Sequence, residues 1–252
     1  MMTGIAVWGI RLALAVFAWP TLASAQDALS FPSTNETSAA VSDATAASAP
    51  SDSLSSGRLQ TADFLDEVAS NDARRVADWV VRSGNNGSLP FVIIDKVQAK
   101  VFVFDHVGRL RGATLALLGK ALGDDSAPGI GDEKLSSIPP EDLTTPAGRF
   151  VASLGRDNHN VTILWVDYGL ALSLHRVVRG APGEHRSARL ATTSTLDKRI
   201  SHGCINVPAK FFDDVVLKTF NGTSGIVYIL PEIKTLQDVF PAVADDQTAQ
   251  RQ

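Results

Sequence analysis

The only cysteine of the 252-residue chain, Cys204, lies in a short stretch whose side chains could perform nucleophilic catalysis. His202 stands two residues before it and Gly203 stands directly before it. The thiolate is the reactive form of cysteine, and nearby positive charge increases the thiolate population. We therefore expect Cys204 to be a nucleophile that is served by a histidine as general base. The alternative is a buried cysteine that acts only as a small apolar side chain.

Two histidines upstream of this stretch could supply the base. Residues 170–178 read as a strand in which Ser173 and His175 share the face opposite the leucines. His185 stands in a loop with Gly and Pro, which would hold a base less rigidly. We therefore expect His175 to be the base and to lie within hydrogen-bond distance of the thiol. His202 is expected to orient the loop or to hydrogen-bond within the site.

The other residues of the stretch have expected supporting roles. The backbone amides of Gly203 and Cys204 could form an oxyanion hole, because glycine permits a close approach. Ser201 is expected either to orient an imidazole or to close a turn. Arg199 is a candidate for binding a substrate carboxylate. Asn206 is expected to cap a helix that begins just after it, or to contact substrate, and the positive end of that helix would favour the thiolate.

The elements that must position these residues are mostly strands. Apolar runs rich in β formers predict strands at 91–95, 100–105, 109–117, 161–168, 170–178 and 225–230. Helical spacing predicts helices over 61–83, with a break near residue 71, over 211–220, and as a single turn over 236–240. Long polar segments at 119–145 and 179–198 are expected to be functional, such as a lid or a wall of a substrate groove. The fold class is therefore expected to be mainly β, a sandwich-like domain with peripheral helices.

Composition divides the chain into five expected parts. Arg11 precedes an apolar run, and Ala23-Ser24-Ala25 matches a small-x-small cleavage site, which together predict a secretory signal. The alternative is a signal that is kept as a membrane anchor. The following segment is rich in Ser, Ala and Thr and poor in large apolar residues, which predicts disorder. The expected parts are a signal peptide at 1–25, a linker at 26–58, a helical segment at 59–88, a catalytic domain at 89–231 and a tail at 232–252.

Charge and cysteine content exclude several classes of protein. The net charge of −4 and the lack of an Arg-rich run argue against nucleic acid as a partner. A single cysteine cannot form an internal disulfide, although export leads to an oxidising compartment. No metal site is expected, because His175, His185, His202 and Cys204 lack the spacing of zinc ligands. No cofactor is expected either.

Six residues, Ser201 to Asn206, resemble the Ser/Thr-His-Gly-Cys-x-Asn/Arg signature of the L,D-transpeptidase catalytic domain. The segment Thr145 to Phe150 is similar to the Thr-Pro-x-Gly-x-Phe segment of the same family, and His175 is similar in context to its upstream histidine. The resemblance covers roughly residues 91–231 in the family's order. The chain departs from the family at Arg176, where the usual residue is glycine.

The resemblance implies the family's fold and its peptidoglycan cross-link chemistry, which bears on cell-wall organisation and cell shape. In that family the cysteine attacks the carbonyl at the L-centre of the third stem-peptide residue and expels the terminal D-alanine, and carbapenems acylate the same cysteine. The implied partners are stem peptides, with a second stem or a wall-attached protein as acceptor. The implied location is the periplasm or cell envelope, without a stable membrane span after signal cleavage. The alternatives are a carboxypeptidase or other cell-wall peptide hydrolase, and a non-catalytic cell-wall-binding module.

The low apolar content of the segment before Arg58 leads to a first prediction. A chain that begins at Arg58 should have the same melting temperature and the same rate of Cys204 acylation as the longer chain, because the deleted residues bury too little apolar surface to support the fold. Thermal unfolding and intact-mass kinetics would measure both. A large fall in melting temperature would mean that the deleted segment packs on the domain.

Overall fold

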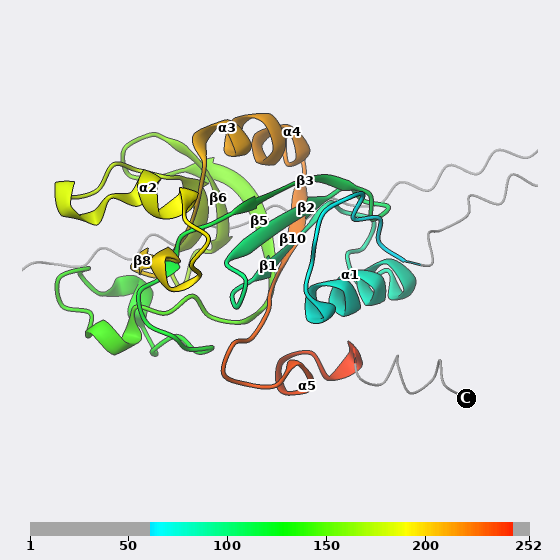
Figure 1. The fold of residues 1–252 in the computed structure, drawn as a ribbon, viewed down its shortest axis with the longest axis horizontal. Helices are drawn as coiled ribbons and strands as arrows, with labels where there is room; N and C mark the ends of the chain where they lie inside the picture. The colour runs from blue at the N-terminus through cyan, green and yellow to red at the C-terminus, as the bar shows by residue number, and fades with distance from the viewer. Residues whose placement is uncertain (1–60, 244–252) are drawn as a thin grey trace, which may run out of the picture. The chain divides into compact units, whose positions relative to one another are not determined.

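The structure is a computed structural model that describes residues 61–243. The expected signal peptide and linker lie outside the described residues. The expectation of a mainly β fold is confirmed, since eight strands of residues 61–243 form one sheet (Figure 1). In spatial order these are β3 (Leu110–Leu115), β2 (Lys100–Phe104), β1 (Phe91–Asp95), β10 (Ser224–Ile229), β5 (Gly148–Arg156), β6 (Thr162–Asp167), β7 (Leu172–Arg176) and β9 (Ile205–Val207).

Most neighbouring strands of the large sheet are antiparallel, and two pairs are parallel. β1 pairs with β10 in parallel, and β7 pairs with β9 in parallel. The second pairing joins the predicted histidine strand to the residues that follow the cysteine. A separate two-stranded sheet pairs β4 (Leu118–Gly119) with β8 (Arg199–Ser201). No helix within residues 61–243 is both long enough and apolar enough to cross a membrane.

Apolar side chains cover both faces of the large sheet, which explains why β1 reads as a continuous apolar run. Val92 and Ile94 belong to one core cluster, which includes the apolar side of a helical segment made of α3 (Ala209–Phe211), a π-helical turn (Phe212–Val216) and α4 (Leu217–Thr219). Phe91 and Ile93 belong to the other, which includes α1 (Asn71–Ser83) and α5 (Leu236–Val239). In Figure 1 the two sets of helices lie on opposite sides of the strands.

Residues 61–70 do not form the predicted helix. The chain there is irregular, and α1 begins at Asn71, with the side chain of Ser70 accepting a hydrogen bond from Ala73 N at 3.1 Å. The physical reason is that Asp63 pairs instead with the sheet: its amide donates to Gly108 O at 2.9 Å, and its carbonyl accepts from Leu110 N at 2.9 Å. The predicted end of α1 is confirmed, because Gly84 caps it in the left-handed region with a φ of 69°.

The chain after Cys204 also differs from the prediction, which placed the start of a helix just after Asn206. Residues Ile205–Val207 form β9, and helix α3 begins only at Ala209. Asn206 exchanges backbone hydrogen bonds with Leu117 at 2.8 and 2.9 Å, and Val177 N donates to Val207 O at 2.7 Å. These pairings hold the chain extended. The cysteine is therefore separated from the helix start by a strand, and the expected helix-dipole effect on the thiol is wrong.

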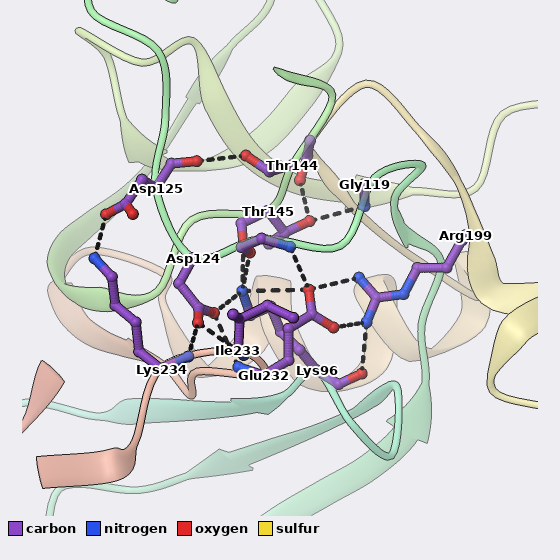
Figure 2. Close-up of polar contacts among 12 residues, drawn as sticks. Lys96, Gly119, Asp124, Asp125, Thr144, Thr145, Arg199, Glu232, Ile233 and Lys234 are labelled. Atoms are coloured by element: carbon purple, nitrogen blue, oxygen red, sulfur yellow. Dashed lines mark hydrogen bonds and ion pairs between the residues drawn. The ribbon is translucent and has the colours of Figure 1, made fainter. Parts of the chain in front are cut away.

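A buried cluster of four charges ties distant segments together (Figure 2). Lys96, which follows β1, pairs with Asp124 at 2.7 Å and with Glu232 at 3.5 Å. Arg199 of β8 forms an ion pair with Glu232 and donates to the carbonyl of Lys96 at 3.0 Å. The Lys96 side chain is 0% exposed and that of Asp124 is 1% exposed. The cluster joins the turn after β1, the 119–145 segment, β8 and the chain after β10.

The surroundings of Asp124 strongly favour its charged form. Burial by itself raises the pKa of this carboxyl, but the hydrogen bond from Lys96 and those from the backbone amides of Glu232, Ile233 and Lys234 outweigh burial and lower the pKa to about 2. Since the folded-state pKa is depressed, the stabilisation is fully present above the unfolded value of 3.8 and is lost as the pH falls toward about 2.

Removing one charge from this cluster should destabilise the fold. We predict that Asp124→Asn lowers the free energy of unfolding at neutral pH by about 3–5 kcal/mol, because Lys96 is left buried without its nearest carboxylate. The variant should also lose less stability than the parent between about pH 4 and pH 2. Chemical denaturation over this pH range would measure both effects.

Asp214→Asn is a matched control for this prediction. Asp214 pairs with Lys210, whose side chain is 90% exposed, so its replacement should lower the free energy of unfolding much less than Asp124→Asn does. Equal effects of the two substitutions would contradict the assignment of the buried cluster as a stabilising constraint.

Candidate active site

Cys204 lies in a tight turn between β8 and β9. Ser201 Oγ donates to Cys204 O at 2.6 Å and accepts from Gly203 N at 3.1 Å. Gly203 has a φ of 128°, and a Cβ at this position would lie 2.8 Å from Thr144 O. Only glycine fits this turn without displacing its neighbour. Ser201 thus has the turn-closing role, and the Gly203 amide, expected as an oxyanion donor, bonds inside the turn.

Thr145 supports the turn from beneath. Its hydroxyl donates to Gly203 O at 2.7 Å and accepts from Gly119 N at 2.8 Å, while its own carbonyl accepts from Lys96 Nζ at 2.8 Å (Figure 2). The side chain is fully buried. Thr145 therefore connects the buried charge cluster to the cysteine turn, a role that its place in the Thr-Pro motif did not specify.

His175 contacts the thiol, as expected from the strand pattern. The parallel pairing of β7 with β9 places His175 opposite Asn206 and Leu174 opposite Ile205. The imidazole is half-buried and interacts electrostatically with the side chain of Cys204. Leu174 faces the core on the opposite side of the strand. The alternation of residues along β7 therefore gives the histidine its position.

The tautomer of His175 follows from its second contact. Nδ1 lies 2.8 Å from Arg176 O, and a carbonyl can only accept, so Nδ1 carries a hydrogen. In the neutral imidazole this leaves Nε2 unprotonated and able to accept the proton of the thiol. The carbonyl has the orienting role that a carboxylate has in other nucleophile–histidine pairs.

Two groups on the β7 side also contact the sulfur. Ser173 Oγ donates to Cys204 Sγ at 3.4 Å, and the thiol donates to Ala171 O at 3.6 Å. Burial by itself raises the pKa of Cys204, but the hydrogen bond and the charge of His175, with the contacts to Ser173, outweigh it and lower the pKa. Burial lowers the pKa of His175, and the interactions with Cys204 outweigh it and raise the pKa. Cys204 and His175 thus stabilise each other's charged forms.

Asn206 contacts His175, and Arg186 contacts Asn206. Asn206 is 1% exposed; its Nδ2 lies 3.3 Å from His175 Nε2 and donates to Cys204 O at 3.2 Å. Arg186 begins helix α2 (Arg186–Ala191) and donates to Asn206 Oδ1 at 3.0 Å. Asn206 is thus neither the expected helix cap nor exposed to substrate. Nothing in the sequence pattern singled out Arg186, which stands in the polar segment before the motif.

The remaining predicted residues lie at different distances from this centre. His202 is exposed and lines the same cavity as Cys204. His185 is exposed and adopts a left-handed φ of 47° at the start of α2. Arg199 is engaged in the buried charge cluster, so its guanidinium already has a carboxylate partner in Glu232. We therefore assign Arg199 to the support of the turn rather than to substrate binding.

A cavity of about 80 Å³ opens beside the sulfur. Its walls come from the 119–145 segment, from the β6–β7 connection and from the cysteine turn. Most of the lining side chains are apolar, and Glu133 is the acidic one. The large apolar side chains are those of Ile130, Leu135, Ile138, Leu170 and Leu172. The 119–145 segment thus lines the cavity beside the sulfur, and its expected role as a wall of a substrate groove stays a prediction. Within residues 61–243 no group of three or more His, Cys, Asp or Glu side chains could hold a metal ion.

Comparisons with known proteins give structural matches only. No protein family model matches the chain, and no curated protein sequence matches it. Similar solved structures include the helical cell shape determining protein Pgp2 from Campylobacter jejuni, with a TM-score of 0.39, 14% identity, and coverage of 65% of this chain and 57% of that one. An L,D-transpeptidase from Mycobacterium tuberculosis H37Rv has a TM-score of 0.33, 15% identity and coverage of 56% and 57%.

The catalytic domain of the Enterococcus faecium L,D-transpeptidase is also similar, with a TM-score of 0.29, 15% identity, and coverage of 56% of this chain and 96% of that domain. The chain spans 64% and 57% of the length of two Pgp2 structures. The solved structures thus include the family that the cysteine motif resembles. All these TM-scores lie below 0.5, so the functional proposal rests on the residues of the site.

The contact between His175 and the thiol leads to a prediction about the two candidate bases. His175→Ala should slow acylation of Cys204 by a carbapenem by about 10²–10⁴-fold, the usual contribution of a general base. His185→Ala is the matched control and should change the rate by less than about tenfold, because its side chain is exposed and held in a separate turn. Intact-mass time courses would measure the rates. Slowing by His185→Ala alone would reverse the assignment.

Proposed function

We propose that this protein is a cysteine acyltransferase of the cell wall, an L,D-transpeptidase acting on peptidoglycan stem peptides. The observation that carries the proposal is the contact between Cys204 and His175, with Nδ1 of the histidine committed to Arg176 O. This geometry leaves Nε2 to receive the thiol proton. The Ser-His-Gly-Cys-x-Asn motif supports the choice of substrate class.

The first half of the reaction forms a thioester. Nε2 of His175 takes the proton of Cys204, and Sγ attacks the carbonyl carbon at the L-centre of the third stem residue. The carbonyl oxygen becomes an oxyanion, for which the amide of Cys204 is the proposed donor, because the Gly203 amide bonds to Ser201 Oγ. The C–N bond to D-alanine then breaks, and the proton on Nε2 passes to the leaving amine.

The second half releases the acyl group. An acceptor amine attacks the thioester carbonyl, His175 takes a proton from the amine, and the thiolate of Cys204 leaves and is reprotonated. The acceptor is a second stem peptide or a lysine of a wall-attached protein. Water in place of the amine would give a carboxypeptidase or another cell-wall peptide hydrolase. The apolar walls of the cavity favour transfer, because they disfavour water near the thioester.

The proposed location is the periplasm or cell envelope. It follows from the expected signal peptide and from the proposed substrate, because the stem peptides of the assembled cell wall lie outside the cytoplasmic membrane. A lone thiol retained after export fits a catalytic role, because the fold has no disulfide partner to offer it.

A defined reaction tests this proposal. Purified protein incubated with tetrapeptide stems should release D-alanine and form a cross-linked dimer, whereas Cys204→Ser should do neither, because a hydroxyl does not supply the thiolate that attacks the carbonyl. Mass spectrometry of products and of the intact protein would follow both the cross-link and the acyl-enzyme.

Ser173→Ala serves as the control, since it removes a hydroxyl that contacts the sulfur but leaves the nucleophile in place. It should retain the cross-linking reaction at a reduced rate. Release of D-alanine without cross-links would identify a hydrolase. Binding of stem peptides without any release would identify a non-catalytic wall-binding module, and turnover by Cys204→Ser would overturn the assignment of the nucleophile.

A further inference from the structure

Asn206 connects His175 to the buried side chain of Arg186 through polar contacts. Arg186 is 8% exposed, and its guanidinium has two side-chain partners. It donates to Asn206 Oδ1 at 3.0 Å and to Glu184 Oε2 at 2.7 Å. Arg186 contacts neither the cavity lining nor the sulfur among the described interactions. Its effect on the reaction therefore reaches the thiol through His175, either directly by charge or through Asn206.

The arginine and the carbonyl of Cys204 together set the direction of the Asn206 amide. A guanidinium has five N–H donors and no acceptor, so the atom that faces it must be the amide oxygen. The amide nitrogen then points the other way and lies 3.3 Å from His175 Nε2 and 3.2 Å from Cys204 O. Each polar group of Asn206 has a partner in this orientation. Turning the amide over would place two donors against each other at Arg186.

This orientation favours one protonation state of the histidine. An N–H of Asn206 directed at Nε2 can be accepted only if Nε2 carries a lone pair, which is the neutral imidazole. In the imidazolium, Nε2–H and the Asn206 N–H would be two donors in contact. The reversed amide would instead accept from Nε2–H and would favour the imidazolium.

We propose that Arg186 is a positioning residue that acts through Asn206 to hold His175 as a neutral base, and so limits the resting population of the imidazolium–thiolate pair. The inference rests on the proposed function for its catalytic meaning. A base that is neutral at rest can accept the thiol proton when substrate is in place. A thiol that stays largely protonated at rest is also less exposed to oxidation after export.

The charges around His175 act in opposite directions. Cys204, in the loop before β9, raises the pKa of the histidine, and Arg186 of α2 opposes this effect. Asp157, in the turn between β5 and β6, also interacts electrostatically with the ring. On β7 itself, Arg176 turns its guanidinium to Asp213, at 2.9 Å through Nε. Arg186 is thus the cation that acts against the charged form of the base.

The test is the pH dependence of Cys204 alkylation by iodoacetamide, which needs no cell-wall substrate. In Arg186→Met the Asn206 amide loses the donor that faces Oδ1, and His175 loses a nearby positive charge, so the imidazolium–thiolate pair gains population. We expect alkylation at about pH 5.5 to become about fivefold faster, since one hydrogen bond is worth about 1 kcal/mol and 1.4 kcal/mol corresponds to tenfold. The NMR titration of His175 should move to higher pH in the same variant.

Four variants separate this effect from a loss of structure. Arg186→Lys still donates to Asn206 Oδ1 and should restore the parent profile. Arg189→Met is the matched control on the same helix, because Arg189 bonds to Glu184 O and Asp197 O instead, and it should leave the profile unchanged. In a His175→Ala background, Arg186→Met should have no effect on the profile. If Arg186→Met fails to fold, Arg186→Leu should give the same acid shift, because leucine also offers Asn206 Oδ1 no donor.

An unchanged profile in folded Arg186→Met or Arg186→Leu would overturn the inference, as would an equal shift caused by Arg189→Met. Failure of the proposed function looks different. A protein that does not act on stem peptides, but whose Cys204 alkylation responds to Arg186 as expected, would refute the transpeptidase proposal and leave the inference standing. A protein that cross-links stems while its alkylation profile ignores Arg186 would refute only the inference.

Discussion

The buried ammonium of Lys96 is the constraint on which the site depends. A charge without solvent must have partners, and Lys96 obtains them from segments that are far apart in the chain: Asp124 and Thr145 O in the long loop, and Glu232 after β10. Arg199 supplies the second positive charge and joins β8 to the same cluster. Because these partners and Arg199 lie on three separate segments, satisfying one lysine fixes how the segments meet (Figure 2).

Thr145 connects the buried charge cluster to the turn that carries Cys204. Thr145 accepts from Lys96 with its carbonyl and donates to Gly203 O with its hydroxyl, so the turn that carries Cys204 is supported from the interior. On the other side, the parallel pairing of β7 with β9 places His175 against that turn. The nucleophile therefore belongs to a loop held by buried charges, and its base belongs to a rigid strand. Holding both groups on rigid elements is what an ordered proton transfer requires.

Several opposing interactions, rather than one strong interaction, determine the pKa values of Cys204 and His175. Cys204 and His175 favour each other's ionised forms, whereas Arg186 disfavours the imidazolium directly and, in our proposal, through the orientation of Asn206. The helix-dipole stabilisation expected from the sequence plays no part, because β9 separates the thiol from α3. The protonation of the site is thus set by side chains from α2, β7 and β9 together.

Local patterns in the sequence determined the strands, the alternation that turns His175 and Ser173 away from the leucines, and the tight turn at Gly203. Periodicity and turn chemistry report only on near neighbours, and these features depend on near neighbours. Tertiary structure alone decided that Asp63 pairs with the sheet, that residues 205–207 extend as β9, and that Arg199 enters a buried cluster. It also brought Arg186 to Asn206, which is 20 residues away in the chain. Such contacts exist only once distant segments pack, because a buried polar group takes the partner that the fold places beside it.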